Sequence, residues 1–149
     1  MAKRAARQTR GQGSRRTLTA DQALIALFIG AMEANDRTSA EEAARAHHLI
    51  WSTHQFRRRS GEAVGRLIEE TRRRTADTTD RAPLMDRAAR AIPRRQRLPA
   101  FAVLADLLLA DGRLDRREAQ FLRTVGAALG LERRTQRSVV DVVLLKNRL

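Results

Sequence analysis

The residues best suited to chemistry in this chain are carboxylates at a tight turn in its C-terminal half. Asp111 precedes a glycine, and Asp115 and Glu118 follow within the next seven positions. Hard oxygen ligands in a short loop suit Ca²⁺ or Mg²⁺ better than zinc or iron. The three side chains could face one another across the turn and hold a divalent cation such as Ca²⁺, Mg²⁺ or Mn²⁺.

The same residues also have an interpretation that needs no ion. Asp115 is suited to cap the next helix, and Glu118 is spaced to complete a capping box. Asp111 is expected at the C-terminal end of a helix, where the helix dipole disfavours a carboxylate by about 0.3–1 kcal/mol. An ion pair with Arg113 or Arg116 would offset that cost. Spacing alone leaves both interpretations open.

A related segment 76 residues earlier indicates an internal duplication. It too consists of an apolar helix, a polar turn and a second helix that opens with a capping-box pattern. Its turn offers Asp36 and Glu42 as further metal ligands, but Asn35 replaces the first carboxylate, so an ion there would be held more weakly. Five identical pairs align at this offset: Ala26 and Ala102, Ala34 and Ala110, Arg37 and Arg113, Glu42 and Glu118, and Ala43 and Ala119.

Other polar and aromatic residues have simpler interpretations. His47 and His54 are seven residues apart, about 10 Å along a helix, so we interpret the histidines, including His48, as surface or linker residues. Trp51 is expected to anchor a helix end in the core, because no second aromatic is suitably spaced to help it bind bases. Asp106 lies in an apolar helix and needs a partner, for which a neighbouring arginine is the simplest choice.

Apolar residues at helical spacing predict the elements that position these side chains. Glu132 to Lys146 is ambiguous because its four valines favour strands, but their spacing fits a helix and a lone strand would have no partner. The fold is therefore expected to be all-α. Helices are predicted over 20–34, from Ser39 toward Trp51, 60–75, 83–92, 98–110, 115–129 and 132–146, with a basic linker over 52–59.

The length of 149 residues suits one domain, because a chain of this size buries roughly two-thirds of its unfolded surface on folding. The absence of cysteine excludes disulfides, thiolate metal sites and cysteine nucleophiles. The longest apolar runs are shorter than the roughly 20 residues that a membrane-spanning helix needs. We expect a cytoplasmic protein that does not span a membrane.

The first 17 residues carry six basic side chains and no acid, and we interpret them as a disordered tail before a domain over 18–149. The net charge is +13, so +7 remains on the domain without these six. An alternative function is therefore binding of nucleic acid or an anionic surface through the tail. The tail cations are Lys3, Arg4, Arg7, Arg10, Arg15 and Arg16.

Catalytic motifs are missing from the sequence. It contains no glycine-rich phosphate loop, no nucleophilic serine elbow, no His-Glu-x-x-His pattern and no zinc-ligand spacing. We expect no enzymatic activity and no organic cofactor.

Several motifs together resemble the TerB-like family, which is associated with tellurite resistance. The resemblance extends from Leu18 to Leu149, and the Asp-Gly turn with its following glutamate is its most specific part. The matching segments are Leu107-Leu-Leu-Ala-Asp-Gly-Arg-Leu-Asp-Arg-Arg-Glu118, Phe121-Leu122, Leu129-Gly130-Leu131 and Val142-Val-Leu-Leu-Lys-Asn-Arg148.

The resemblance implies a pseudo-two-fold bundle of about seven helices built from the duplicated helix-turn-helix unit. It also implies that acidic residues of the two turns bind divalent cations, and by motif matching these are Asp111, Asp115, Glu118 and Glu42. Family members belong to systems that resist tellurite and other chemical stress. The chain is therefore expected to be a non-enzymatic interaction module with protein partners in such a system.

Overall fold

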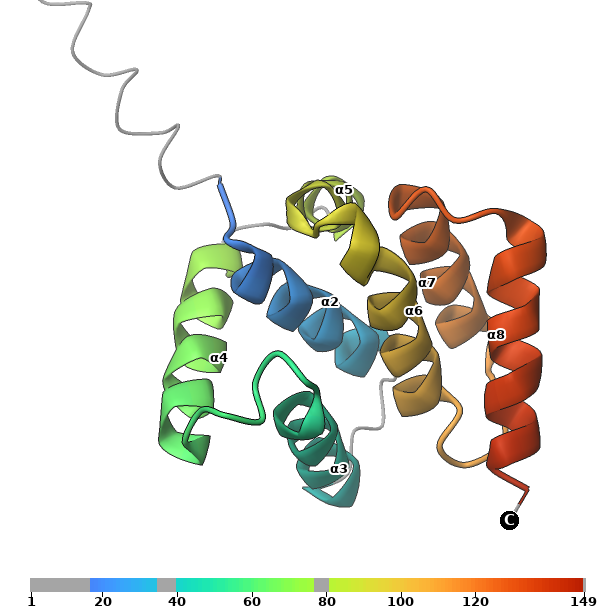
Figure 1. Ribbon diagram of the computed structural model, residues 1–149, viewed down its shortest axis with the longest axis horizontal. Helices are drawn as coiled ribbons and strands as arrows, with labels where there is room; N and C mark the ends of the chain where they lie inside the picture. Colours follow the sequence, from blue (N-terminus) through green and yellow to red (C-terminus); the bar gives the residue numbers. More distant parts are fainter. Residues whose placement is uncertain (1–16, 35–39, 77–80, 149) are drawn as a thin grey trace, which may run out of the picture.

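The computed structural model describes residues 17–34, 40–76 and 81–148, without the side chains of Glu41 and Glu42 (Figure 1). These residues form helices and no strand, which confirms the all-α prediction. The described helices are α2 (Ala20–Ala34), α3 (Ala40–Ser52), α4 (Gly61–Thr75), α5 (Arg81–Ala91), α6 (Arg94–Leu108), α7 (Arg116–Ala128) and α8 (Arg133–Lys146).

The helix α2 is the centre of the bundle. Ten consecutive residues from Gln22 to Ala31 are buried, because α3, α4, α5, α6 and α7 all pack against it. A Cβ atom on Gly30 would lie 2.8 Å from Met85 Cε and 3.0 Å from Phe121 Cε2, so α5 and α7 approach α2 closely there. The nearly uniform apolar character of this segment thus reflects burial on all sides.

The helix α8 lies at one edge of the bundle, where it packs on α6 and α7 (Figure 1). This helix confirms the choice of helix over strand for the valine-rich segment. Val143 is buried against the core, whereas Val142 and Leu145 are more than 60% exposed. No described helix is long and apolar enough to cross a membrane.

Two of the helices, α3 and α7, lie at the offset of the predicted internal duplication. Ala40 and Arg116 begin α3 and α7, and Ser52 and Ala128 end them, so both bounds differ by 76 positions. The preceding helices α2 and α6 have 15 residues each. The bounds of α2 and α6 differ by 74 positions and not 76, so an internal duplication and a pseudo-two-fold relation between the halves both stay predictions.

The largest error in the predicted boundaries is the start of α6, which lies at Arg94 and not near residue 98. Pro93 is its N-cap with φ −55° and ψ 143°, and the helix then continues through Pro99. Pro99 has no backbone N–H to donate to the Arg95 carbonyl, so the helix continues there with one backbone hydrogen bond fewer. Apolar patterning missed the start because the first turn, Arg94 to Arg97, is polar.

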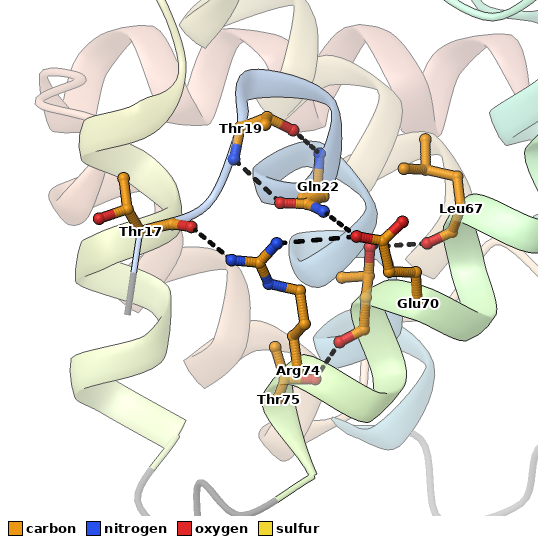
Figure 2. Close-up of polar contacts among 8 residues, drawn as sticks. Thr17, Thr19, Gln22, Leu67, Glu70, Arg74 and Thr75 are labelled. Carbon is orange, nitrogen blue, oxygen red and sulfur yellow. Dashed lines mark hydrogen bonds and ion pairs between the residues drawn. The ribbon is translucent and has the colours of Figure 1, made fainter. Parts of the chain in front are cut away.

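The N-terminus of α2 is joined to α4 by polar side chains (Figure 2). Thr19 and Gln22 form the predicted capping box, in which each side chain accepts from the other residue's backbone N–H. Arg74 Nη2 donates to the Thr17 carbonyl over 3.1 Å. Thr17, predicted to belong to the tail, is thus attached to the domain, whereas residues 1–16 lie outside the described part of the chain.

Candidate functional site

The turn between α6 and α7 begins where Leu109 caps α6. The Leu109 N–H donates to the Ala105 carbonyl, and the Gly112 N–H donates to the Leu109 carbonyl over 2.9 Å. Gly112 has φ 76°, a left-handed conformation that glycine adopts without steric cost. The predicted Asp-Gly turn is therefore formed, with its acidic side chains placed by backbone geometry.

The carboxylate of Asp111 is exposed and lies three residues beyond the last residue of α6. Its Oδ1 accepts a hydrogen bond from the Arg113 backbone N–H over 3.0 Å. No ion pair found among the described residues involves Asp111. A backbone amide, and not the side chain of Arg113 or Arg116, therefore stabilises this carboxylate.

The carboxylates of Asp115 and Glu118 form the predicted capping box of α7. Asp115 Oδ1 accepts from the N–H groups of Arg117 and Glu118 over 2.7 and 2.8 Å. Glu118 Oε2 in turn accepts from the Asp115 N–H over 2.8 Å. Glu118 is only 6% exposed, whereas Asp115 is exposed. The capping interpretation is thus confirmed.

A closed metal site is not formed by the described residues. Nowhere in the described ranges do three or more histidine, aspartate or glutamate side chains gather so that they could hold an ion. Asp111 and Asp115 both face solvent, but Glu118 is buried with one oxygen engaged in the capping box. Asp36 and the side chain of Glu42 lie outside the described residues, as do the tail cations.

The histidines are placed as predicted, because His47, His48 and His54 are all exposed. The prediction for Trp51 is wrong: it is 42% exposed, and Phe56 of the following linker is fully buried in the core. The indole Nε1–H donates to the Arg59 carbonyl over 3.0 Å. The linker therefore turns inward at Phe56, which leaves the tryptophan at the surface.

The partner of Asp106 is a lysine and not an arginine. Lys146 Nζ of α8 donates to Asp106 Oδ1, and the Asp106 side chain is 28% exposed. Next to this pair, Asn147 Nδ2 donates to the Leu109 carbonyl over 2.8 Å. Sequence spacing could not reveal either contact, since the partners are about forty positions apart. Both contacts hold the end of α6, from which the candidate turn starts.

Comparison with known families gives one match: a family model described as "Tellurite resistance protein TerB" covers residues 21–139. The matched region includes α2 from its second residue, α3 to α7 in full and the first half of α8, and it contains the Asp111–Glu118 turn. Neither the curated proteins nor the solved structures gave a match. Because the family match spans most of its length, the chain belongs to the TerB family.

Proposed function

We propose that this chain is a non-enzymatic interaction module of a tellurite and chemical-stress resistance system, and that its Asp111–Glu118 turn responds to divalent cations. The family match over residues 21–139 is the observation that carries the assignment to such a system. The turn supports a binding role, because its polar side chains are carboxylates and arginines, which attract ions and charged partner surfaces.

The cation is bound by the exposed carboxylates of Asp111 and Asp115. In the described hydrogen bonds both residues use Oδ1, and no described contact uses Oδ2 of either residue. Mg²⁺ is typically bound through one or two carboxylates and keeps several waters, whereas Ca²⁺ takes six to eight oxygen ligands. Two carboxylates therefore suit a largely hydrated ion such as Mg²⁺ or Mn²⁺, held with low affinity.

Direct binding of tellurite at this turn is disfavoured by charge. Tellurite is an anion, and it would meet the carboxylates of Asp111 and Asp115 at an exposed surface. Cation binding would neutralise these carboxylates and change which charged partner surface docks on the turn. The role in resistance is thus that of a cation-dependent contact with a protein partner.

Calorimetric titration with Mg²⁺, Mn²⁺ and Ca²⁺ tests the site. Asp111→Asn and Asp115→Asn keep a side-chain oxygen for the described hydrogen bonds and remove only the charge, because asparagine also caps helices well. The wild type is expected to bind, and the double Asn variant to lose binding. Asp141→Asn, at an exposed acid of α8, is the matched control and should bind like the wild type. Absence of heat from the wild type, or equal heat from the double variant, would exclude the site.

The role in resistance is tested by growth on tellurite of cells that lack this protein. Complementation with the wild type should restore growth, and complementation with the Asp111→Asn/Asp115→Asn double variant should not. Equal growth with both proteins would show that resistance does not depend on the cation site. The assignment of the chain to a resistance system would then rest on the family match alone.

A second candidate function is the binding of an anionic partner through the basic tail. The hydrogen bond from Arg74 to the Thr17 carbonyl fixes the last residue of the tail to the last turn of α4, on which Arg72 and Arg73 are also exposed. Deletion of residues 1–16 leaves this hydrogen bond intact. If the six tail cations contact phosphates, the deletion should reduce the salt dependence of duplex DNA affinity by up to about five logarithmic units per decade of salt. Unchanged affinity and salt dependence would exclude the tail as the contact.

A further inference from the structure

The segment from residue 43 to residue 60 is strongly basic. It contains four arginines and three histidines and no acidic residue. It covers most of α3 and the connection to α4, and its exposed side chains include those of His47, His48, Arg57 and Arg58. Arg57 and Arg58 take part in none of the ion pairs found among the described residues. This surface is therefore suited to a negatively charged ligand.

Trp51 lies in the middle of this segment as a half-exposed aromatic ring. It is 42% exposed, and its Nε1–H is bound to the Arg59 carbonyl over 3.0 Å. Arg59 is itself held by an ion pair with Asp21 of α2, and its guanidinium carbon lies 5.5 Å from the centroid of the buried Phe56 ring. The indole is thus fixed to a rigid part of the fold before any ligand arrives.

The histidines share the face of α3 on which Trp51 lies. His47 and His48 precede it by four and three residues, the spacing that places side chains next to one another on a helix. Arg57 and Arg58 follow in the connection that starts two residues after Trp51. We call His47, His48, Trp51, Arg57 and Arg58 the Trp51 surface. It combines one fixed aromatic face with groups that bind phosphate.

We propose that the Trp51 surface binds single-stranded nucleic acid, with one unpaired base stacked on the indole and the neighbouring phosphates bound by Arg57 and Arg58. Base stacking on an aromatic side chain needs no particular base, and arginines neutralise the backbone charge. A duplex keeps its bases stacked on each other and offers none to Trp51. The ligand is therefore a single strand, of either DNA or RNA.

The distribution of apolar residues favours this ligand over a lipid surface. Among the described residues, the other large exposed apolar side chains are Leu98 of α6 and Val142 and Leu145 of α8, and none belongs to the Trp51 surface. Membrane-surface helices bury an apolar face made of several large side chains. A single indole among cations matches stacking better than insertion. Binding at this surface needs neither the Asp111–Glu118 turn nor the tail.

The fluorescence of Trp51 provides a direct test, because the chain has one tryptophan and no tyrosine. The full-length wild type is titrated with 12-nucleotide oligo(dT) and oligo(rU), with a 12-base-pair duplex, and with phosphatidylcholine vesicles containing phosphatidylserine. Stacking predicts strong quenching by one or both single strands and little by the duplex. Equal quenching by the duplex, or a blue shift with vesicles and no response to single strands, overturns the proposal.

Substitutions test the two parts of the surface by anisotropy of a labelled oligo(dT). Trp51→Leu should weaken binding about five-fold or more, in line with the loss of one stacked base. Arg57→Gln/Arg58→Gln should reduce the salt dependence by about 1.4 logarithmic units per decade, as expected for two lost phosphate contacts on a single strand. Arg133→Gln/Arg134→Gln removes two exposed cations from α8 and is the matched control, because it lowers the net charge by the same amount as the Arg57/Arg58 variant. Its affinity for oligo(dT) should stay near that of the wild type.

Circular dichroism establishes that each variant is folded before its affinity is compared. If Trp51→Leu does not fold, Trp51→Phe takes its place, because it retains an aromatic ring without the indole N–H. Its affinity for oligo(dT) should lie between those of the wild type and the Arg57/Arg58 double variant. Unchanged affinity in both the tryptophan and the Arg57/Arg58 variants would show that the oligonucleotide binds elsewhere, and the proposal would be wrong.

Discussion

Gln22 of α2 and Glu70 of α4 are joined by a hydrogen bond from Gln22 Nε2 to Glu70 Oε1 over 3.0 Å (Figure 2). Gln22 is only 4% exposed, and its Oε1 accepts from the Thr19 N–H. Glu70 also pairs with Arg74, which in turn holds the Thr17 carbonyl. One buried amide thus links the start of the central helix to α4 and to the entry of the chain.

Replacement of Gln22 by alanine should therefore lower the free energy of unfolding by about 1–2 kcal/mol, because a cap and a partly buried hydrogen bond are lost together. Urea unfolding followed by circular dichroism measures this change. Gln120→Ala, at an exposed glutamine of α7, is the control and should change stability by less than about 0.5 kcal/mol. Equal stability of both variants would contradict the role of Gln22.

Local patterns predicted most of the fold because they depend on neighbours in the sequence. The capping boxes at Thr19 and Asp115 are formed as predicted. Gly130 has φ 72° and ends α7, with the Gly130 N–H bonded to the Ala127 carbonyl and the Leu131 N–H to the Gly126 carbonyl. These are the two hydrogen bonds of a Schellman motif, which a glycine at this position favours.

The errors come from contacts between distant segments. The absence of a second suitably spaced aromatic predicts that Trp51 anchors a helix end in the core, but the linker that follows places Phe56 in the core instead. The lysine that pairs with Asp106 is forty residues away, on a helix whose packing no local pattern specifies. For the candidate site, the sequence predicted the capping roles of Asp115 and Glu118 but not how deeply Glu118 is buried.

Two substitutions of Asp115, the N-cap of α7, distinguish its capping role from an effect of its charge. Asp115→Ala removes the acceptor of two backbone N–H groups and should cost about 0.5–2 kcal/mol of stability. Asp115→Asn retains an acceptor and should cost less than about 0.5 kcal/mol, because the two residues are similar N-caps. Thermal unfolding of the two variants measures the difference. Equal destabilisation by asparagine would show that charge, and not capping, stabilises this position.

The contacts between α6 and α8 should differ in strength. Asn147→Ala removes one of the two hydrogen bonds that the carbonyl of the fully buried Leu109 accepts and leaves the one from the Gly112 N–H, and we expect a loss of about 1–1.5 kcal/mol. Lys146→Met breaks a partly exposed ion pair with Asp106 and should cost less than about 1 kcal/mol. Urea unfolding at low and high salt distinguishes them, because only the lysine variant should lose its effect at high salt. The reverse order of stabilities would contradict this ranking.

Arg97 should matter more for stability than the neighbouring arginines of α6. Its Nε donates to the Ile92 carbonyl over 3.2 Å and its Nη1 to the Leu129 carbonyl over 3.4 Å, so it joins the end of α5 to the C-terminus of α7. A cation at a helix C-terminus also interacts favourably with the helix dipole. Arg97→Met keeps much of the aliphatic packing but removes both hydrogen bonds, and we expect a loss of about 1–2 kcal/mol. Arg95→Met, at an exposed position of the same helix, should change stability by less than about 0.5 kcal/mol, and an equal loss from both variants would show that Arg97 acts only through surface charge.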